Sequence, residues 1–215
     1  MSRNGLLIVA AVILALGAAA VFLGSNYLGT NLFGPTSLED RFANDMQKIT
    51  SEGGFAATFT DADSRRWQLA DGHKFERLAL DSSNAALGRL SSSVPVDATP
   101  PSWESQGLSI ELPISFAQQS NGKRIEIGIA ARSARSNPSN VLTAVFATRQ
   151  AGNSGWRNFK LSSELKIHTI LFDMPFVESG YTSKPIVVLH SDAAGRGRAV
   201  EIVGLYVKLV PRAQP

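Results

Sequence analysis

The first 28 residues are strongly apolar, and the hydrophobic pattern changes after them. Residues 6–23 form an almost unbroken apolar run, and no charged residue occurs between Arg3 and Glu39. A helix rises about 1.5 Å per residue, so about 20 apolar residues cross a hydrocarbon layer of about 30 Å. A helix also satisfies its own backbone hydrogen bonds in lipid. The pattern therefore predicts a cytoplasmic stub and one transmembrane helix within residues 1–28.

The charges on either side of this run predict its orientation. Arg3 and the terminal amine precede the run, whereas Glu39 and Asp40 are the first charges after it. Positive flanks stay in the cytoplasm, so the rest of the chain is expected in the periplasm, as a single-pass protein of a bacterial inner membrane. A cleaved signal peptide is the alternative, because residues 18–20 are three alanines that suit a cleavage site. The run is longer than the usual core of about 7 to 15 residues, which favours the anchor.

Residues 29–54 are expected to connect the membrane span to a folded domain. Gly, Pro, Asn and Ser in residues 29–37 end the first helix and form a short linker. Apolar residues then recur at helical spacing, at Leu38, Phe42, Met46 and Ile49. This stripe predicts a short amphipathic helix over residues 38–51. Its polar face mixes both signs of charge, which favours packing against the exported domain over a membrane-surface or self-association role.

From residue 55 to 215 the pattern is that of short β-strands separated by Gly, Pro, Asn and Ser clusters. Apolar and polar residues alternate most clearly over residues 109–116 and 124–129, so each of these strands has one buried face. Further strands are expected at residues 75–80, 141–149, 156–161, 167–172, 186–190 and 200–209. About nine strands favour two antiparallel sheets packed face to face, an all-β sandwich of the jelly-roll kind.

Composition and charge exclude several classes of function. The 44% hydrophobic content is too high for a disordered chain, and no cysteine is present to form a disulfide, a thiol nucleophile or a zinc ribbon. The net charge is +3, and the basic residues are scattered, so no basic footprint for nucleic acid is formed. Nucleic acid is therefore not an expected partner.

No enzyme motif is found, and we expect no catalytic residue, metal site or cofactor. His73, His168 and His190 are too dispersed for a zinc triad. Residues 190–192 read His-Ser-Asp, but strand alternation points neighbours to opposite faces, so they cannot form a catalytic triad. Asp61 and Asp63 fit a turn better than a calcium loop, because arginines follow where further ligands are needed. An envelope hydrolase would need a close acid and base pair, and no such pair is identifiable.

Segments of the last third follow one another as in a known superfamily. They are residues 155–161 (GWRNFKL), 168–172 (HTILF), 185–189 (PIVVL), 199–202 (AVEI) and 205–207 (LYV). Over residues 100–210 the chain resembles the galactose-binding-like jelly roll of carbohydrate-binding modules, in which a W-x-x-F-x-L strand precedes an aromatic, an apolar and a closing acidic strand. The resemblance implies binding of a sugar or a partner more often than catalysis. The calcium-site residues of many members are not found in this chain.

Four residues are the candidate ligand contacts. Trp156 shares its alternation with Asn158 and Lys160 and is expected to point outward, where its ring can cover the apolar face of a sugar. Arg157 follows it, and Arg196 and Arg198 lie in a glycine-rich loop that suits an acidic group. The competing interpretations are a tryptophan folded over the rim of the sandwich and a solvated hairpin connection. Trp103 is a weaker candidate, and Trp67 is expected to pack in the core.

Two functions remain open at this point. The first is a membrane-anchored periplasmic β-sandwich that binds carbohydrate, or a partner, in polysaccharide or cell-envelope assembly. The second is a non-catalytic structural subunit of an inner-membrane protein complex, in which the sandwich makes only protein contacts. A short tether would concentrate either kind of domain near the bilayer.

Overall fold

The computed structural model describes residues 38–60, 63, 65–78 and 86–211. From Glu39 onward the chain belongs to one compact unit. The expected transmembrane helix and the linker up to residue 37 lie outside the described residues. Within that described part, no helix combines the length and the apolar character that crossing a bilayer requires.

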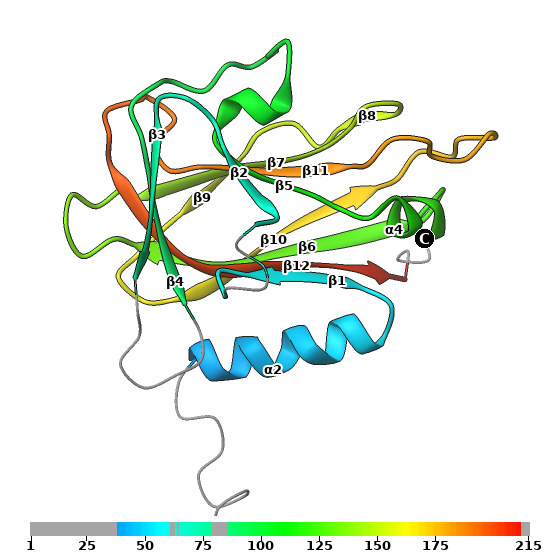
Figure 1. Cartoon of the computed structure of the whole chain (residues 1–215), viewed down its shortest axis with the longest axis horizontal. Helices are drawn as coiled ribbons and strands as arrows, with labels where there is room; N and C mark the ends of the chain where they lie inside the picture. The colour runs from blue at the N-terminus through cyan, green and yellow to red at the C-terminus, as the bar shows by residue number, and fades with distance from the viewer. Residues whose placement is uncertain (1–37, 61–62, 64, 79–85, 212–215) are drawn as a thin grey trace, which may run out of the picture. The chain divides into compact units, whose positions relative to one another are not determined.

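Two six-stranded antiparallel sheets form the unit (Figure 1). Sheet A has the order β10-β6-β12-β4-β3, with β1 beside β12. Its strands are β1 (Phe55–Thr58), β3 (His73–Leu78), β4 (Leu87–Ser92), β6 (Arg124–Ser133), β10 (Lys166–Asp173) and β12 (Ala199–Val210). Sheet B has the order β2-β5-β11-β7-β8, with β9 beside β7. Its strands are β2 (Trp67–Leu69), β5 (Leu108–Glu111), β7 (Val141–Thr148), β8 (Gly152–Asn153), β9 (Arg157–Lys160) and β11 (Ile186–His190). The all-β antiparallel sandwich expected from the sequence is therefore confirmed.

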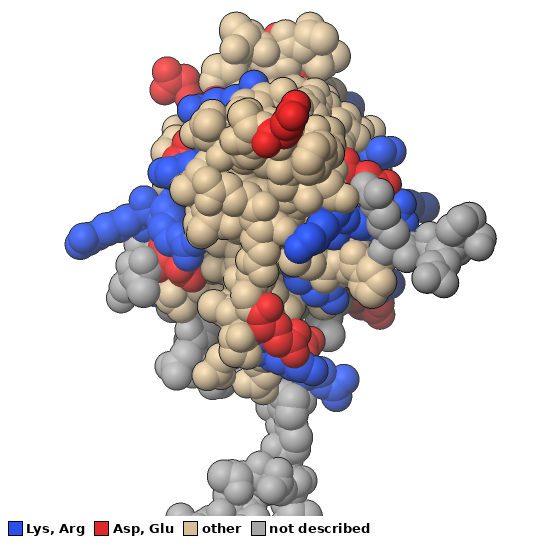
Figure 2. Space-filling view, turned by 90° about the vertical axis from the view of Figure 1, so that its right-hand side faces the viewer, with Lys and Arg blue, Asp and Glu red and all other residues tan. Residues whose placement is uncertain are grey.

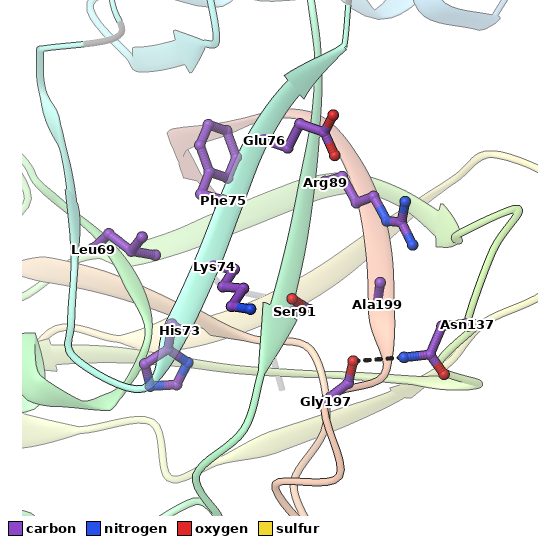
Figure 3. Close-up of a pocket in the computed structure, with 10 residues that line it drawn as sticks. All are labelled: Leu69, His73, Lys74, Phe75, Glu76, Arg89, Ser91, Asn137, Gly197 and Ala199. Carbon is purple, nitrogen blue, oxygen red and sulfur yellow. Dashed lines mark hydrogen bonds between the residues drawn. The ribbon is translucent and has the colours of Figure 1, made fainter.

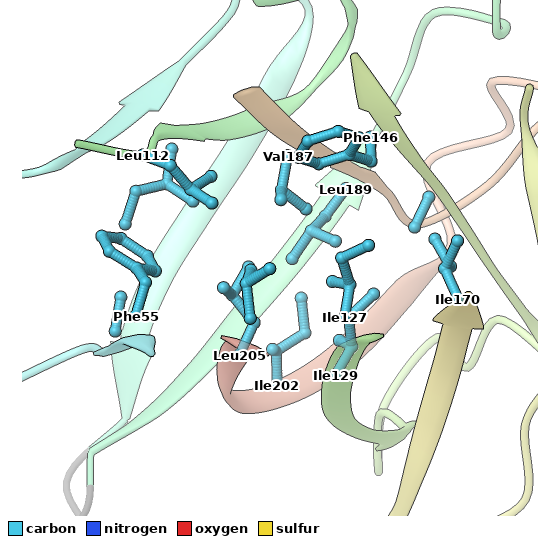
Figure 4. Packing of buried hydrophobic residues seen from close by; sticks show 14 of the residues in the cluster. Phe55, Leu112, Ile127, Ile129, Phe146, Ile170, Val187, Leu189, Ile202 and Leu205 are labelled. Carbon is cyan, nitrogen blue, oxygen red and sulfur yellow. The ribbon is translucent and has the colours of Figure 1, made fainter. Parts of the chain in front are cut away.

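The inward faces of the two sheets form the main core (Figure 4). Ile125, Ile127 and Ile129 of β6 alternate inward from sheet A and are fully buried. Val187 and Leu189 of β11 do the same from sheet B. Each fully buried aliphatic side chain of this kind contributes about 1.5–3 kcal/mol. This alternation is why the strand positions could be inferred from the sequence.

The amphipathic helix is present as α2 (Leu38–Ser51), as the stripe predicted. Phe42, Met46 and Ile49 are buried against the outer face of sheet A, where they form a second apolar cluster with Val203 and Tyr206. Gly54 ends the helix by donating its amide to the Ile49 carbonyl at 2.9 Å. Figure 1 shows α2 lying along β1 and β12. The favoured interpretation, packing against the domain, is therefore confirmed.

One expected strand is wrong over part of its length. Only Leu108–Glu111 of the region around residues 109–116 is strand, as β5, and α4 (Ile114–Gln119) follows it. Pro113 has a φ of −58° and precedes the helix, and its carbonyl accepts the amides of Phe116 and Ala117. Proline favours the start of a helix and ends a strand, because it has no N–H to donate. The short strands β1, β2, β4 and β8 were not separately predicted, nor was the 3-10 turn η1 (Trp103–Gln106).

Candidate functional site

The outer face of sheet B has an apolar floor. Val145 and Ala147 of β7 lie beside Ile186 and Val188 of β11, and all four side chains are buried. Strand alternation points them away from the main core. They are covered instead by two partly buried tryptophans, Trp103 and Trp156.

The two tryptophans contact each other edge to face. Their ring centroids lie 5.8 Å apart at an interplanar angle of 63°. The indole N–H of Trp156 donates to the carbonyl of Asp97 at 2.8 Å. Trp156 thus lies on the outer side of the sheet, as its alternation predicted, and it fixes the segment that leads to Trp103. This hydrogen bond occupies the polar edge of Trp156.

Trp103 lines a cavity of about 410 Å³ on this face. A neighbouring cavity of about 320 Å³ shares Gln68 and Glu111 with it. We call the two together the tryptophan groove. Its polar side chains come from four segments of the chain and are Arg65, Arg66, Gln68, Ser102, Glu104, Glu111, Thr148, Arg149 and Lys184.

Ion pairs hold the carboxylates of the tryptophan groove. Arg149 pairs with Glu104 and, at 3.5 Å, with Glu111, and Lys184 pairs with Glu111 at 3.0 Å. Burial alone would raise the pKa of Glu104, but hydrogen bonds from Ser102 and Arg149 hold that pKa below its ordinary value. Glu104 is therefore ionised at neutral pH. A fixed carboxylate accepts hydrogen bonds from hydroxyl groups.

The three candidate arginines from the sequence, Arg157, Arg196 and Arg198, do not line the tryptophan groove. Arg157 is exposed at the start of β9, opposite Ala144 of β7. Arg196 is exposed and Arg198 is half-buried, in the connection from β11 to β12. The buried carboxylate of Asp192 accepts the Arg196 amide at 2.8 Å and so shapes this connection.

Residues 94–97 join the two groups of candidates. The amide of Val96 donates to Ala193 at 3.1 Å, and Asp97 accepts the indole N–H of Trp156. Among the contacts of the described residues, none brings Trp156 or Arg157 directly to Arg196 or Arg198. None of these four candidates lines the tryptophan groove.

A larger cavity, of about 590 Å³, lies on sheet A (Figure 3). Residues of β3 and β4 form its base, and the segments around Asn137 and Gly197 form a wall. We call it the sheet A cavity. Its lining residues are Leu69, His73, Lys74, Phe75, Glu76, Arg89, Ser91, Asn137, Gly197 and Ala199. The four candidates from the sequence do not line this cavity either.

A buried histidine pair lies near one end of the sandwich. The rings of His73 and His190 meet edge to face, with centroids 5.0 Å apart. Burial lowers the pKa of both, and the neighbouring His73 helps to lower that of His190 to about 4. His190 Nε2 lies 3.0 Å from the carbonyl of Val94, so the pair is connected to the segment that leads to Trp103.

The described residues hold no group of three His, Cys, Asp or Glu side chains that suits a metal ion. Asp61 lies outside the described residues. Asp63 accepts the amide of Thr58 at 2.9 Å and pairs with Arg66 at 3.0 Å. Its carboxylate therefore stabilises the turn after β1, as the turn interpretation expected.

No family model matches the chain, and no curated protein matches it. Solved structures do match. The CBM22-1 xylan-binding domain from Paenibacillus barcinonensis Xyn10C has a TM-score of 0.50 at 12% identity, over 74% of this chain and 95% of that domain. The CBM22-1-CBM22-2 tandem domain of the same Xyn10C also gives 0.50 at 12% identity, over 74% of this chain and 46% of the tandem structure. The chain therefore has the β-sandwich fold of carbohydrate-binding modules, and the resemblance seen in the sequence is confirmed at the level of fold.

Little in the sequence marked the tryptophan groove. Glu104 and Arg149 are 45 positions apart in the chain, and no periodicity links them. Trp103 follows Pro100 and Pro101, so strand alternation could not orient it. The adjacency of Trp103 and Glu104 was the one available signal.

Proposed function

We propose that this chain is a non-catalytic carbohydrate-binding protein, anchored in a bacterial inner membrane by its N-terminal helix, and that it binds glycan in the tryptophan groove. The observation that carries the proposal is Trp103 at a groove whose carboxylates are fixed by ion pairs, on the fold of carbohydrate-binding modules. Sugar sites combine an aromatic surface with a few oriented polar groups. The similar solved structures support the sugar class, but they carry no ligand over to this chain.

Each part of the groove has a chemical role in this proposal. The ring of Trp103 covers the apolar C–H face of a sugar, while Glu104 and Glu111 accept its hydroxyl groups. Arg149 holds both carboxylates in place through its ion pairs with Glu104 and Glu111. The ring of Trp156 positions the ring of Trp103 through their edge-to-face contact. Arg157, Arg196 and Arg198 would meet acidic groups of a longer glycan beyond the groove.

Trp103→Ala is expected to weaken glycan binding at least tenfold, because it removes the apolar surface and leaves the sheet intact. The full chain in detergent micelles would be screened against arrayed plant and bacterial polysaccharides, and the best ligand measured by calorimetry. Phe176→Ala is the matched control, since that aromatic side chain is 76% exposed and lies outside the groove. If Trp103→Ala binds as tightly as the wild type, the groove is not the site.

The membrane anchor and the periplasmic location are proposed from the apolar run and its flanking charges. A C-terminal epitope tag should be removed by protease added to intact spheroplasts, while a cytoplasmic marker protein survives. Deletion of residues 1–28 should leave the tag protected and the chain in the soluble fraction. A protected tag on the full chain would contradict the orientation.

Exposed apolar side chains favour a second function, that of a structural subunit. Leu171 of the edge strand β10 is 56% exposed, and Phe176 lies in the connection that follows. That connection reaches the end of the unit seen in Figure 2, where a mostly uncharged surface carries a few acidic side chains and has basic side chains on both sides. A role in envelope assembly could then rest on protein contacts alone. Absence of binding to every arrayed glycan would favour this function over the first.

A further inference from the structure

The sheet A cavity lies on the other sheet from the tryptophan groove and is built differently. Its base is the paired strands β3 and β4, with Ala199 of β12 at one side (Figure 3). Its aromatic neighbours give no stacking surface, because His73 is buried and Phe75 packs against the main core. Recognition in this cavity therefore depends on charge and hydrogen bonds. Its volume of about 590 Å³ is typical of ligand sites.

The wall of the cavity is held rigidly. Asn137 has a φ of 50°, the one positive φ at a non-glycine residue in the described chain. Its side-chain amide donates to Gly197 at 2.8 Å, and its carbonyl accepts the amide of Ala199 at 2.8 Å. Arg89 donates to the neighbouring Ser136 carbonyl at 2.7 Å. Asparagine adopts the left-handed region more readily than other non-glycine residues, and these hydrogen bonds fix it here.

The charges that face this cavity are not neutralised by one another. On sheet A, Arg124 pairs with the opposite Asp173 at 2.8 Å, and Arg132 pairs with the opposite Glu201 at 2.8 Å. Glu201 is also directly opposite Arg89 on its other side. Glu76 and Arg89 are also directly opposite, yet these two described residues form no ion pair with each other. Opposite charges across an antiparallel pair normally attract. Glu76 is therefore available to a ligand, and Arg89 is available through the N–H groups that do not donate to Ser136.

Two further polar groups of the cavity have no partner in the described part of the chain. Lys74 is exposed on β3, and its ammonium forms neither an ion pair nor a hydrogen bond there. Ser91, its neighbour on β4, likewise has a free hydroxyl. The cavity thus presents two cations, Lys74 and Arg89, and one anion, Glu76. Glu201, opposite Arg89, already pairs with Arg132. Lys74, unpaired among the described residues, therefore favours an anionic group, and Glu76 is left to accept hydroxyl groups.

We infer that the sheet A cavity is a second binding site, which takes a sugar residue that bears a carboxylate. Lys74 and Arg89 bind the carboxylate by charge-assisted hydrogen bonds. Glu76, Ser91 and Asn137 bind the ring hydroxyls. The sugar class rests on the proposed function, whereas the site and its preference for an anion rest on this cavity alone.

The test compares two kinds of ligand and two kinds of variant in the full chain. Glucuronate-containing oligosaccharides and neutral xylo-oligosaccharides would be titrated into the detergent-solubilised protein at low and high salt. Lys74→Gln is expected to weaken uronate binding about tenfold and to leave neutral binding unchanged. Trp103→Ala should do the reverse. Lys160→Gln, an exposed lysine of β9, is the matched control and should change neither.

The outcomes separate this inference from the proposed function. Neutral glycan binding that is lost in Trp103→Ala, without any uronate binding, overturns the second site and keeps the first. Uronate binding that is unaffected by Lys74→Gln also overturns it. Inorganic phosphate that displaces the probe where free glucuronate does not would show a phosphate site in place of a carboxylate site. Equal melting temperatures of wild type and Lys74→Gln exclude a folding defect as the cause.

Discussion

Gly128→Ala is expected to lower the free energy of unfolding by about 3 kcal/mol, in the range of severe overpacking in a well-packed region. Gly128 lies in β6 directly opposite Tyr206 of β12, and the tyrosine ring lies over it. A Cβ at this position would come within 2.2 Å of the ring. The ring cannot yield easily, since its hydroxyl donates to Glu126 at 2.8 Å and Phe42 of α2 packs against it.

Urea unfolding of the full chain measures this loss. Thr169→Ala is the matched control, because Thr169 is the exposed residue opposite Gly128 on β10. In the double variant Gly128→Ala with Tyr206→Ala, the loss should be smaller than the sum of the two single losses, because the clash has been removed. A free energy for Gly128→Ala equal to that of Thr169→Ala would show that the ring moves aside at no cost.

Acidification is expected to remove about 3 kcal/mol of stability through His190. The pKa of His190 falls from 6.5 to about 4 on folding, chiefly because burial disfavours the charged ring. Its Nδ1 lies 3.2 Å from the Asp192 amide and must accept that hydrogen, so Nε2 donates to Val94. Only the neutral ring satisfies both contacts.

The direction of this pH effect follows from proton uptake. Between pH 6.5 and 4 the unfolded chain binds the proton and the folded chain does not, so stability is full above pH 6.5 and is lost as the pH falls toward 4. Urea unfolding at about pH 7.5 and about pH 4.5 measures the loss, which carboxylates also affect. His190→Gln should be less stable than the wild type at the higher pH but should lose less on acidification. An identical loss in the wild type and the variant would assign the effect to other groups.

The pattern of apolar positions predicted most of the long strands. The expected bounds of β11 match the structure, and β6, β7, β10 and β12 lie within a few residues of expectation. Alternation marked β6, whereas β7, β11 and β12 are apolar runs that are buried on both faces. β4 reads LGRLSS and lacks β-branched residues, so no pattern marked it. Ile114 continued an apolar alternation, but Pro113 ended the strand and began α4. The missing N–H of Pro113 therefore outweighed the apolar alternation at this point.

The candidate sites depended on contacts that no local pattern contains. Alternation placed Trp156 on the outer side correctly, but its hydrogen bond to Asp97, 59 positions away, could not be read from the strand. The sheet A cavity brings β3 and β4 together with segments that lie far along the chain from both. Residue types predicted which side chains could bind a sugar. Only the pairing of distant strands shows which of them share a cavity.

The position of β12 has a consequence for how this protein is made. β12, the last of the described strands, pairs with β6, β4 and β1, and so joins segments that are synthesised much earlier. Until residues 199–210 leave the ribosome, those three strands present open edges that favour aggregation. The nascent chain therefore has to be shielded until β12 has been synthesised, and loss of residues 199–210 would leave the edges of three strands unpaired.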